Sequence, residues 1–261
     1  MKFRFDGQQG ESICSGLADL EIENRVTDGI LKSGKDYVTK AIRIKKVKDG
    51  NLVPLNKYEV DSINNWLFKS NYKVLEIGRY VYYAIFFKEN RWMKDVDKGY
   101  IDLKIRLKPY AYSSKIVNNI TVVDNTYTYT DDNGAEISVY QGEKIFTINN
   151  KSNVEGLEIY PEICIKLKDD KANLVTIENL TLNNKMIISG LETKECIYIN
   201  GENQYMISKM DETRDIYSKS NEVYLKLQQG INEIKISSNG FANVSICHQE
   251  VFDLGEEWLN E

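Results

Sequence analysis

The chain has 261 residues, of which 42% are hydrophobic and 28% charged, and its formal net charge is −5 at pH 7. This composition is typical of a soluble globular protein with enough apolar residues for one large β domain or two ordinary domains, and we expect two. The negative charge argues against a nucleic-acid-binding protein, which needs a basic surface. The longest apolar run, Tyr80–Phe87, is too short for a membrane helix of roughly 20 residues, and the amino terminus shows no signal peptide. We therefore expect synthesis in a cytoplasm and no membrane insertion.

Strand-forming residues dominate the chain from its start. It contains 17 tyrosines and 8 phenylalanines but 3 prolines, and aromatic and β-branched residues favour strands. Short segments that alternate apolar and polar residues recur between turn residues, as in KFRF, KAIRIKKV, EICIKLK, ECIYIN and INEIKISS. Such spacing predicts an all-β fold, mainly β with one short helix, made of two β-sandwich domains.

The one predicted helix lies within Asn56–Ser70. Its apolar residues recur at spacings of three and four, the period of an amphipathic helix; they are Val60, Ile63, Trp66 and Leu67. Asn56 is followed three positions later by Glu59, a variant of the capping box that starts helices. We predict a helix near 57–69 that packs on a sheet with Trp66 as its largest anchor. The alternative is that Trp66 stacks on a ligand.

A strand with one dry and one wet face follows at Tyr100–Lys108. Its residues alternate without a slip, and Pro109, which cannot donate to a β ladder, ends it. We expect Pro109 to close the first domain and the residues after it to connect to the second.

The region 111–149 is expected to be a connector that contains a hairpin. Asn133 and Gly134 favour the positive φ angles of a tight turn between two tyrosine-bearing strands. A calcium loop at Asp131 is not expected, because the glycine has the wrong offset and no glutamate stands at the twelfth position. We divide the chain into domains 1–140 and 141–261.

No catalytic, metal-binding or cofactor-binding residue is predicted. His248 is the single histidine, and the chain contains no P-loop, G-x-G-x-x-G, H-E-x-x-H or G-x-S-x-G motif. The four cysteines have no C-x-x-C spacing and are expected to be buried free thiols; they are Cys14, Cys164, Cys196 and Cys247. A binding or structural role is left by elimination.

Two further sets of residues have plain structural interpretations. The basic cluster Arg43, Lys45, Lys46 and Lys48 is expected to form the wet face and end of a strand. The sequons would matter only in a secretory compartment, which the amino terminus does not indicate; they begin at Asn119, Asn150, Asn179 and Asn243.

In order and spacing, these segments resemble the distal tail protein family of long-tailed bacteriophages that infect Gram-positive bacteria. In the first domain the resemblance rests on VPLNKYEVDSINNWLFKSNYKVLEIGR, YYAIFF and GYIDLKIRLKPYAY. In the second it rests on FTINNKSNVEGLEIYPEICIKL, TIENLTLNNKMIISGL, ECIYIN and YLKLQQGINEIKI. The match covers nearly the whole chain.

The resemblance implies a first domain with a helix and a β-hairpin extension that assembles head-to-tail into a ring, usually a hexamer, and a galectin-like second domain. The ring, or two rings back to back, would be a non-enzymatic hub at the virion tail tip, synthesised in the bacterial host cytoplasm and lacking a cofactor. Its partners would be the major tail tube protein, the tail-tip protein and receptor-binding proteins, and viral DNA would only pass through the channel. No motif assigns ring-interface residues.

Two other functions stay open on the sequence alone. The second domain could recognise a cell-wall sugar, in which case it should present a groove with an exposed aromatic ring flanked by polar side chains. A glycosidase would instead show two carboxyl groups roughly 5 to 10 Å apart in a cleft.

Overall fold

The computed structural model describes residues 1–25, 30–34, 37–89, 92–123, 126–130, 136–140, 142–170 and 172–253, with the backbone alone for 30–34, 126–130 and 136–140. The chain divides into two compact units. The first unit is Met1–Ser114 with Val251–Glu261, and the second is Lys115–Glu250.

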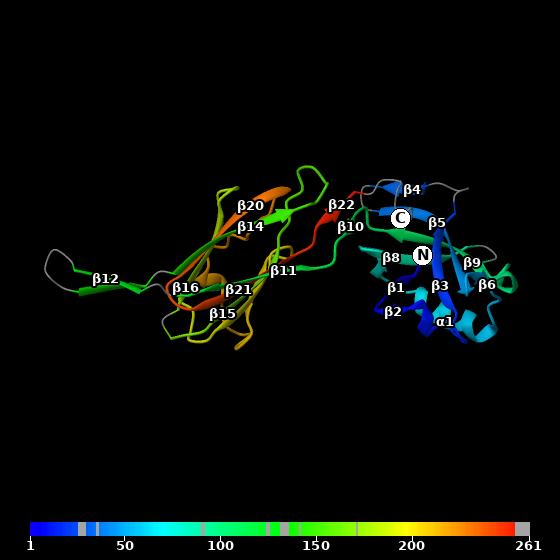
Figure 1. The fold of residues 1–261 in the computed structure, drawn as a ribbon, viewed down its shortest axis with the longest axis horizontal. Helices are drawn as coiled ribbons and strands as arrows, with labels where there is room; N and C mark the ends of the chain where they lie inside the picture. The colour runs from blue at the N-terminus through cyan, green and yellow to red at the C-terminus, as the bar shows by residue number, and fades with distance from the viewer. Residues whose placement is uncertain are drawn as a thin grey trace. The chain divides into compact units, whose positions relative to one another are not determined.

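The first unit is built on one antiparallel sheet of 11 strands, in the order β2-β1-β7-β8-β9-β5-β3 with β4, β6, β10 and β22 off this path (Figure 1). The strands are β1 Phe3–Phe5, β2 Gln8–Gln9, β3 Asp19–Asn24, β4 Ile30–Gly34, β5 Tyr37–Lys48, β6 Asn51–Leu52, β7 Lys73–Ile77, β8 Tyr80–Lys88, β9 Tyr100–Leu107, β10 Ala111–Tyr112 and β22 Val251–Phe252. The residues before β1 pair with β3 near the other end of this path. Lys2 forms an antiparallel β-bridge with Glu21, and the Met1 carbonyl accepts a hydrogen bond from the Ile22 N–H at 2.8 Å. The sheet therefore curls around a single core.

Among the described residues, one α-helix accompanies this sheet, α1 Lys57–Leu67, with two short 3-10 helices, η1 Gly10–Ser12 and η2 Val96–Lys98. The helix begins with the predicted capping box, in which Asn56 and Glu59 each accept from the other's backbone N–H. The prediction of a helix here is confirmed. It ends at Leu67 rather than near 69, because Phe68 leaves helical geometry at φ −87° and ψ 87°.

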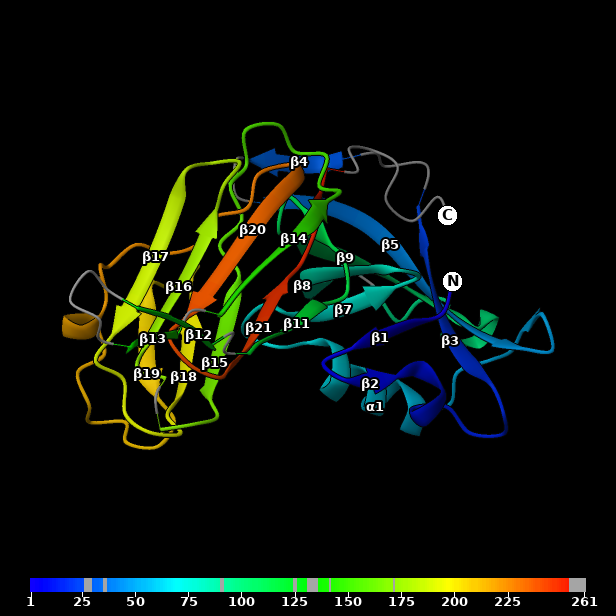
Figure 2. The ribbon, with the colours of Figure 1, turned by 60° about the vertical axis from the view of Figure 1, so that its left-hand side comes forward.

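The second unit is a sandwich of two antiparallel sheets, β11-β21-β15-β18-β19 and β14-β20-β16-β17, with a separate two-stranded ribbon β12-β13. In Figure 2 the strands of the second sheet run side by side. The strands are β11 Ile116–Val122, β12 Thr126–Thr130, β13 Glu136–Tyr140, β14 Gly142–Asn150, β15 Glu162–Leu167, β16 Leu174–Asn179, β17 Asn184–Ser189, β18 Cys196–Asn200, β19 Tyr205–Ser208, β20 Gly230–Ser238 and β21 Ala242–His248, and η3 is Tyr217–Lys219. The inward faces of both sheets supply one aliphatic core.

The predicted all-β fold is confirmed, and its strands follow the alternation of the sequence. Strand β9 buries every second residue and ends at Leu107, just before Pro109. In β21 the pattern of burial alternates over all seven residues, Ala242 to His248. None of the described helices is long and apolar enough to cross a membrane.

The two units differ in extent from the predicted domains 1–140 and 141–261. The chain enters the second unit at Lys115, because β11 pairs with β21 from Ile116–His248 to Val122–Ala242. It returns to the first unit where Val251 and Phe252 pair with β10. The expected connector therefore consists largely of strands that belong to the two units.

The predicted hairpin is present as the antiparallel pair β12-β13, which runs from Thr126–Tyr140 to Thr130–Glu136. Its expected turn residues, Asn133 and Gly134, lie outside the described residues, as does Asp131. The described hairpin lies in the second unit.

Candidate assembly surfaces

The packing of α1 depends on Trp66. The indole is 4% exposed, stacks on Phe3 with ring centroids 5.3 Å apart, and meets Phe5 edge-on at 6.4 Å. Its Nε1–H donates to the Phe5 carbonyl at 2.9 Å. Trp66 is thus a core residue that joins the helix to β1, as predicted, and is not a surface for stacking a ligand.

A buried polar cluster fixes the start of the same helix. The Glu59 carboxylate is 3% exposed and accepts from Lys46 Nζ, from the Asn56 N–H, and from both the N–H and the hydroxyl of Ser15. Burial raises the pKa of Glu59, but the hydrogen bonds from Lys46, Asn56 and Ser15 outweigh it and lower the pKa below its usual value. One carboxylate therefore holds together β5, the helix and the loop at Ser15.

The basic cluster in β5 is only partly a wet face. Arg43 pairs with Asp102 through two hydrogen bonds of 2.8 and 3.1 Å, and Lys45 pairs with Glu23 at 2.6 Å. Lys48 is exposed, as predicted. Lys46 is 7% exposed and faces the core side, so its predicted exposure is wrong. It shares the parity of the buried Ile42 and Ile44, and Glu59 stabilises its charge there.

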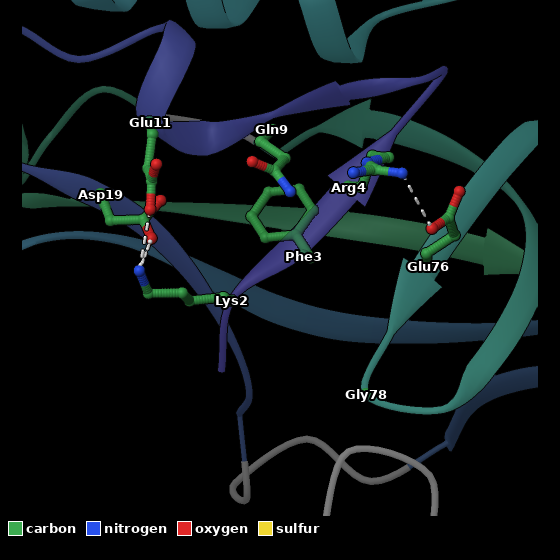
Figure 3. A pocket seen from close by; sticks show the side chains of 8 residues that line it. All are labelled: Lys2, Phe3, Arg4, Gln9, Glu11, Asp19, Glu76 and Gly78. Carbon is green, nitrogen blue, oxygen red and sulfur yellow. Dashed lines mark hydrogen bonds and ion pairs between the residues drawn. The ribbon is translucent and has the colours of Figure 1, made fainter.

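A hollow of about 220 Å³ lies over β1 and its neighbours in the first unit, lined by Lys2, Phe3, Arg4, Gln9, Glu11, Asp19, Glu76 and Gly78 (Figure 3). Lys2 Nζ binds Asp19 at 2.8 Å and Glu11 at 2.9 Å. Its hydrogen bond to Asp19, followed by that to Glu11, raises the pKa of Lys2. Two carboxylates that share one lysine form an ion-pair network, unlike a glycosidase pair in which one carboxyl stays protonated to act as an acid.

His248 is 4% exposed, and neither ring nitrogen has a hydrogen-bond partner. Burial lowers the pKa of His248, and the charge of Glu250 only partly opposes this effect. The imidazole is therefore a neutral core side chain at the end of β21, without a described group that would orient it as a general base.

The four cysteines are free, as predicted, but half-buried rather than fully buried. Burial raises the pKa of Cys14 to about 12, and it also raises the pKa of Cys164 and Cys247. The Cys164 and Cys196 sulfurs lie 3.9 Å apart on neighbouring strands. Protonated thiols are weak nucleophiles and weak metal ligands. Within the described part of the chain, no cluster of three or more His, Cys, Asp or Glu residues could hold a metal ion.

Sequence reasoning missed a set of buried asparagines in the second unit. Asn150, Asn179 and Asn232 are fully buried. The side chain of Asn232 donates to the Gln228 and Gly230 carbonyls at 2.9 and 3.0 Å, and it accepts from the Gln228 N–H at 2.9 Å. The signal was present in the alternation, since Asn232 is in phase with the buried Ile234 and Ile236.

The buried Asn179 and the half-buried Asn184 fix irregular backbone beside the sheet. Asn179 donates to the Lys226 carbonyl at 2.8 Å and to Asn232 Oδ1 at 2.9 Å. Asn184 accepts from the Lys226 N–H at 2.8 Å and donates to the Tyr224 carbonyl at 3.2 Å. The sequons at Asn150 and Asn179 therefore mark core positions, where the side chain replaces backbone partners that an irregular segment cannot find.

Tyr217 of η3 is the exposed aromatic side chain among the described residues of the second unit. Tyr217 is 40% exposed, but its hydroxyl accepts from the Met206 N–H and donates to the Gln204 carbonyl, each at 3.3 Å. The Tyr217 hydroxyl is thus hydrogen-bonded to backbone groups of its own unit. The acidic tail with Trp258 and Leu259 lies outside the described residues.

A family model described as a phage tail C-terminal domain matches residues 127–248, within the second unit. A Bacillus subtilis (strain 168) protein described as the SPbeta prophage-derived uncharacterized protein YomH is 25% identical over 198 residues, which cover 71% of this chain and 70% of that protein.

Among solved structures, the SPP1 Dit protein is similar at a TM-score of 0.52 and 9% identity, covering 95% of this chain and 98% of that one. A chain of the phage P2 baseplate is similar at a TM-score of 0.37 and 12% identity, over 95% of this chain and 90% of that one. The predicted resemblance to the phage distal tail proteins is confirmed, and the chain has the Dit fold across both units.

Proposed function

We propose that the chain is a structural, non-enzymatic hub protein of a phage tail, placed at the distal end where the tail tube meets the tail tip or baseplate. The observation that carries this proposal is the fold shared with SPP1 Dit over 95% of this chain. That protein is described as a paradigm of the hub adsorption apparatus in phages that infect Gram-positive bacteria. The phage tail domain matched at residues 127–248 supports the same role independently.

The first unit is the proposed ring-forming part. A ring needs head-to-tail contacts between two different surfaces of each copy, and these surfaces must keep their shape in every copy. A curled sheet with an aromatic core, locked to its helix by Trp66 and Glu59, supplies such a rigid body. A hexamer, with the tube protein and the tail-tip protein as partners, is the assembly we propose from the family resemblance.

The second unit is the proposed peripheral part. It has its own core, so the first unit can enter a ring without any rearrangement of the sandwich. The family resemblance also suggests a galectin-like sandwich, and that label names a fold without implying sugar binding.

An antibody raised against residues 115–250 would test the place of the protein in the particle. Immunogold labelling of the phage particles whose genome encodes the chain should put gold at the distal end of the tail, and antibody pre-absorbed with the purified protein is the control. Gold on the capsid, or particles that contain none of the protein, would contradict the proposal.

A further inference from the structure

One face of the first unit carries basic side chains that pair with no acidic group in the described part of the chain. Along β9 the apolar residues face the core, and the alternate residues form the opposite face. On that face Asp102 is paired with Arg43 at 2.8 Å. Lys104, Arg106 and Lys108 form no ion pair with any described residue. We call this area the Arg106 surface, which comprises Tyr37 of β5, Tyr83 and Phe87 of β8, Lys104 and Arg106 of β9, and Lys108 directly after β9.

Arg106 is held in place by aromatic rings rather than by a carboxylate. Its guanidinium carbon lies 4.5 Å from the centroid of the Tyr37 ring and 5.1 Å from that of Phe87. Its Nε is buried without a hydrogen-bond partner. A guanidinium fixed between rings loses little conformational freedom when it binds, and its planar fork matches a carboxylate. Arg106 is therefore pre-organised to bind an anionic group.

The charge of this region contrasts with that of the whole protein. Residues 1–114 contain 21 basic and 15 acidic side chains, and residues 251–261 add four acidic ones, so the first unit has a balance of +2, although the full chain has a net charge of −5. The Arg106 surface is thus a basic site on a protein that is acidic elsewhere. Such a site attracts an acidic partner by charge complementarity.

The aromatic rings favour a protein partner over single-stranded nucleic acid. Nucleic-acid platforms stack bases on open ring faces. Here the Tyr37 and Phe87 rings each have the Arg106 cation over one face, and Lys108 Nζ lies 4.9 Å from the Tyr83 centroid. The groups best placed for a partner are therefore N–H donors, which bind carboxylates.

The spacing of the cations matches an extended peptide. Lys104, Arg106 and Lys108 are alternate residues of an extended segment, so they are expected to repeat at roughly 6.6 to 6.8 Å. Alternate side chains of another extended segment have the same repeat. We propose that the Arg106 surface docks an extended acidic segment of a partner protein, with carboxylates at alternate positions over Lys104, Arg106 and Lys108. This inference goes beyond the hub role and does not depend on ring formation.

Two fluorescein-labelled peptides of equal charge test the proposal, ESESES and EEESSS. Their affinity for the full-length protein would be measured by fluorescence anisotropy at low salt, where exposed charges are least screened. ESESES should bind several-fold more tightly. Arg106→Ala should weaken its binding roughly tenfold, the loss of one charge-assisted pair. Arg106→Lys should weaken it nearly as much, because the fork is lost although the charge stays.

Lys48→Ala is the matched control, because Lys48 is an exposed lysine at the far end of β5 and should leave binding unchanged. Lys104→Ala, at an exposed position, should weaken binding even if Arg106 variants fold poorly. The proposal is overturned if ESESES does not bind, if Lys48→Ala loses as much affinity as Arg106→Ala, or if the two peptides bind equally. Tighter binding of a dT6 oligonucleotide would assign the surface to nucleic acid, and self-association abolished by Arg106→Ala would assign it to a second copy.

Discussion

The hydrophobic cores of the two units are built from different residue types. The described core of the first unit contains five buried aromatic side chains, Phe3, Phe5, Trp66, Tyr82 and Phe86. That of the second contains aliphatic residues and Met, with Tyr224 as its one buried aromatic ring.

The buried polar groups that join the elements also differ between the two units. In the first unit the Lys46–Glu59 ion pair joins separate elements, whereas in the second unit buried asparagines do so, beside a buried Glu195 that pairs with Arg214 at 3.1 Å. A sandwich whose segment 221–229 runs beside the sheet needs many backbone partners, which amide side chains provide.

Trp66→Ala should have the largest effect and should act on the first unit alone. It removes a buried indole and its hydrogen bond to Phe5, which is expected to cost about 3 to 5 kcal/mol. Urea unfolding followed by tryptophan fluorescence would report this unit, since residues 115–250 contain no tryptophan. An unchanged midpoint would show that Trp66 is not a core anchor.

Glu59→Ala should come next, because it leaves Lys46 buried without a carboxylate. Breaking one side of a buried pair costs about 3 to 5 kcal/mol, whereas replacing both partners with apolar residues is often nearly neutral. The double variant Lys46→Met/Glu59→Leu should therefore recover much of the lost stability of the first unit. If Glu59→Ala and the double variant unfold at the same urea concentration, the unpaired charge of Lys46 is not the cause of the lost stability.

Asn232→Ala tests the buried amide side chain that joins elements of the second unit. It takes away the side-chain acceptor of the Gln228 N–H and the side-chain donor to the Gly230 carbonyl, both part-buried, and should cost about 1 to 3 kcal/mol in the free energy of unfolding. Asn203→Ala, at an exposed position, is the control and should change stability by less than about 0.5 kcal/mol. Far-UV circular dichroism during urea unfolding would measure both, and equal effects would remove the special role of the buried amide.

Mild acid should lower the folding stability of the second unit but not that of the first, and this effect should be the smallest. Burial lowers the pKa of His248. Below pH 6.5, the ordinary pKa of histidine, His248 is therefore protonated in the unfolded chain but stays neutral in the folded unit. The second unit should lose at most about 1.4 kcal/mol per pH unit as the pH falls from 6.5 towards the folded pKa. The pKa of Glu59 is instead lowered from 4.5, so its contribution to the first unit is lost only as the pH falls below that value.

His248→Phe should flatten the loss of stability of the second unit between pH 7 and 5.5, and Glu59→Gln should not. Unfolding curves at several pH values would measure both slopes. An unchanged slope in His248→Phe would mean that another group causes the acid sensitivity.

The alternation and capping signals of the sequence predicted the local structure well. The strand at Tyr100–Leu107, the helix start at Asn56 and the role of Trp66 follow from periods of two and of three to four residues, which depend on near neighbours. Lys46 was misjudged because its residue type was given more weight than its parity in β5.

Features that depend on long-range pairing could not be predicted. The return of Val251 and Phe252 to the first unit rests on β10, which is distant in sequence. The stacking of Arg106 needs Tyr37 and Phe87 from two other strands. Neither arrangement leaves a local pattern, so only the folded sheet shows it.

The central claim, that this chain builds a tail hub through its first unit, is tested most directly by its assembly in solution. Light scattering would give the mass of the purified full-length protein, and negative-stain electron microscopy would show its form. The account predicts closed rings of six copies with a central opening. A protein that stays monomeric at high concentration, and also when mixed with its tail tube and tail-tip proteins, would contradict it.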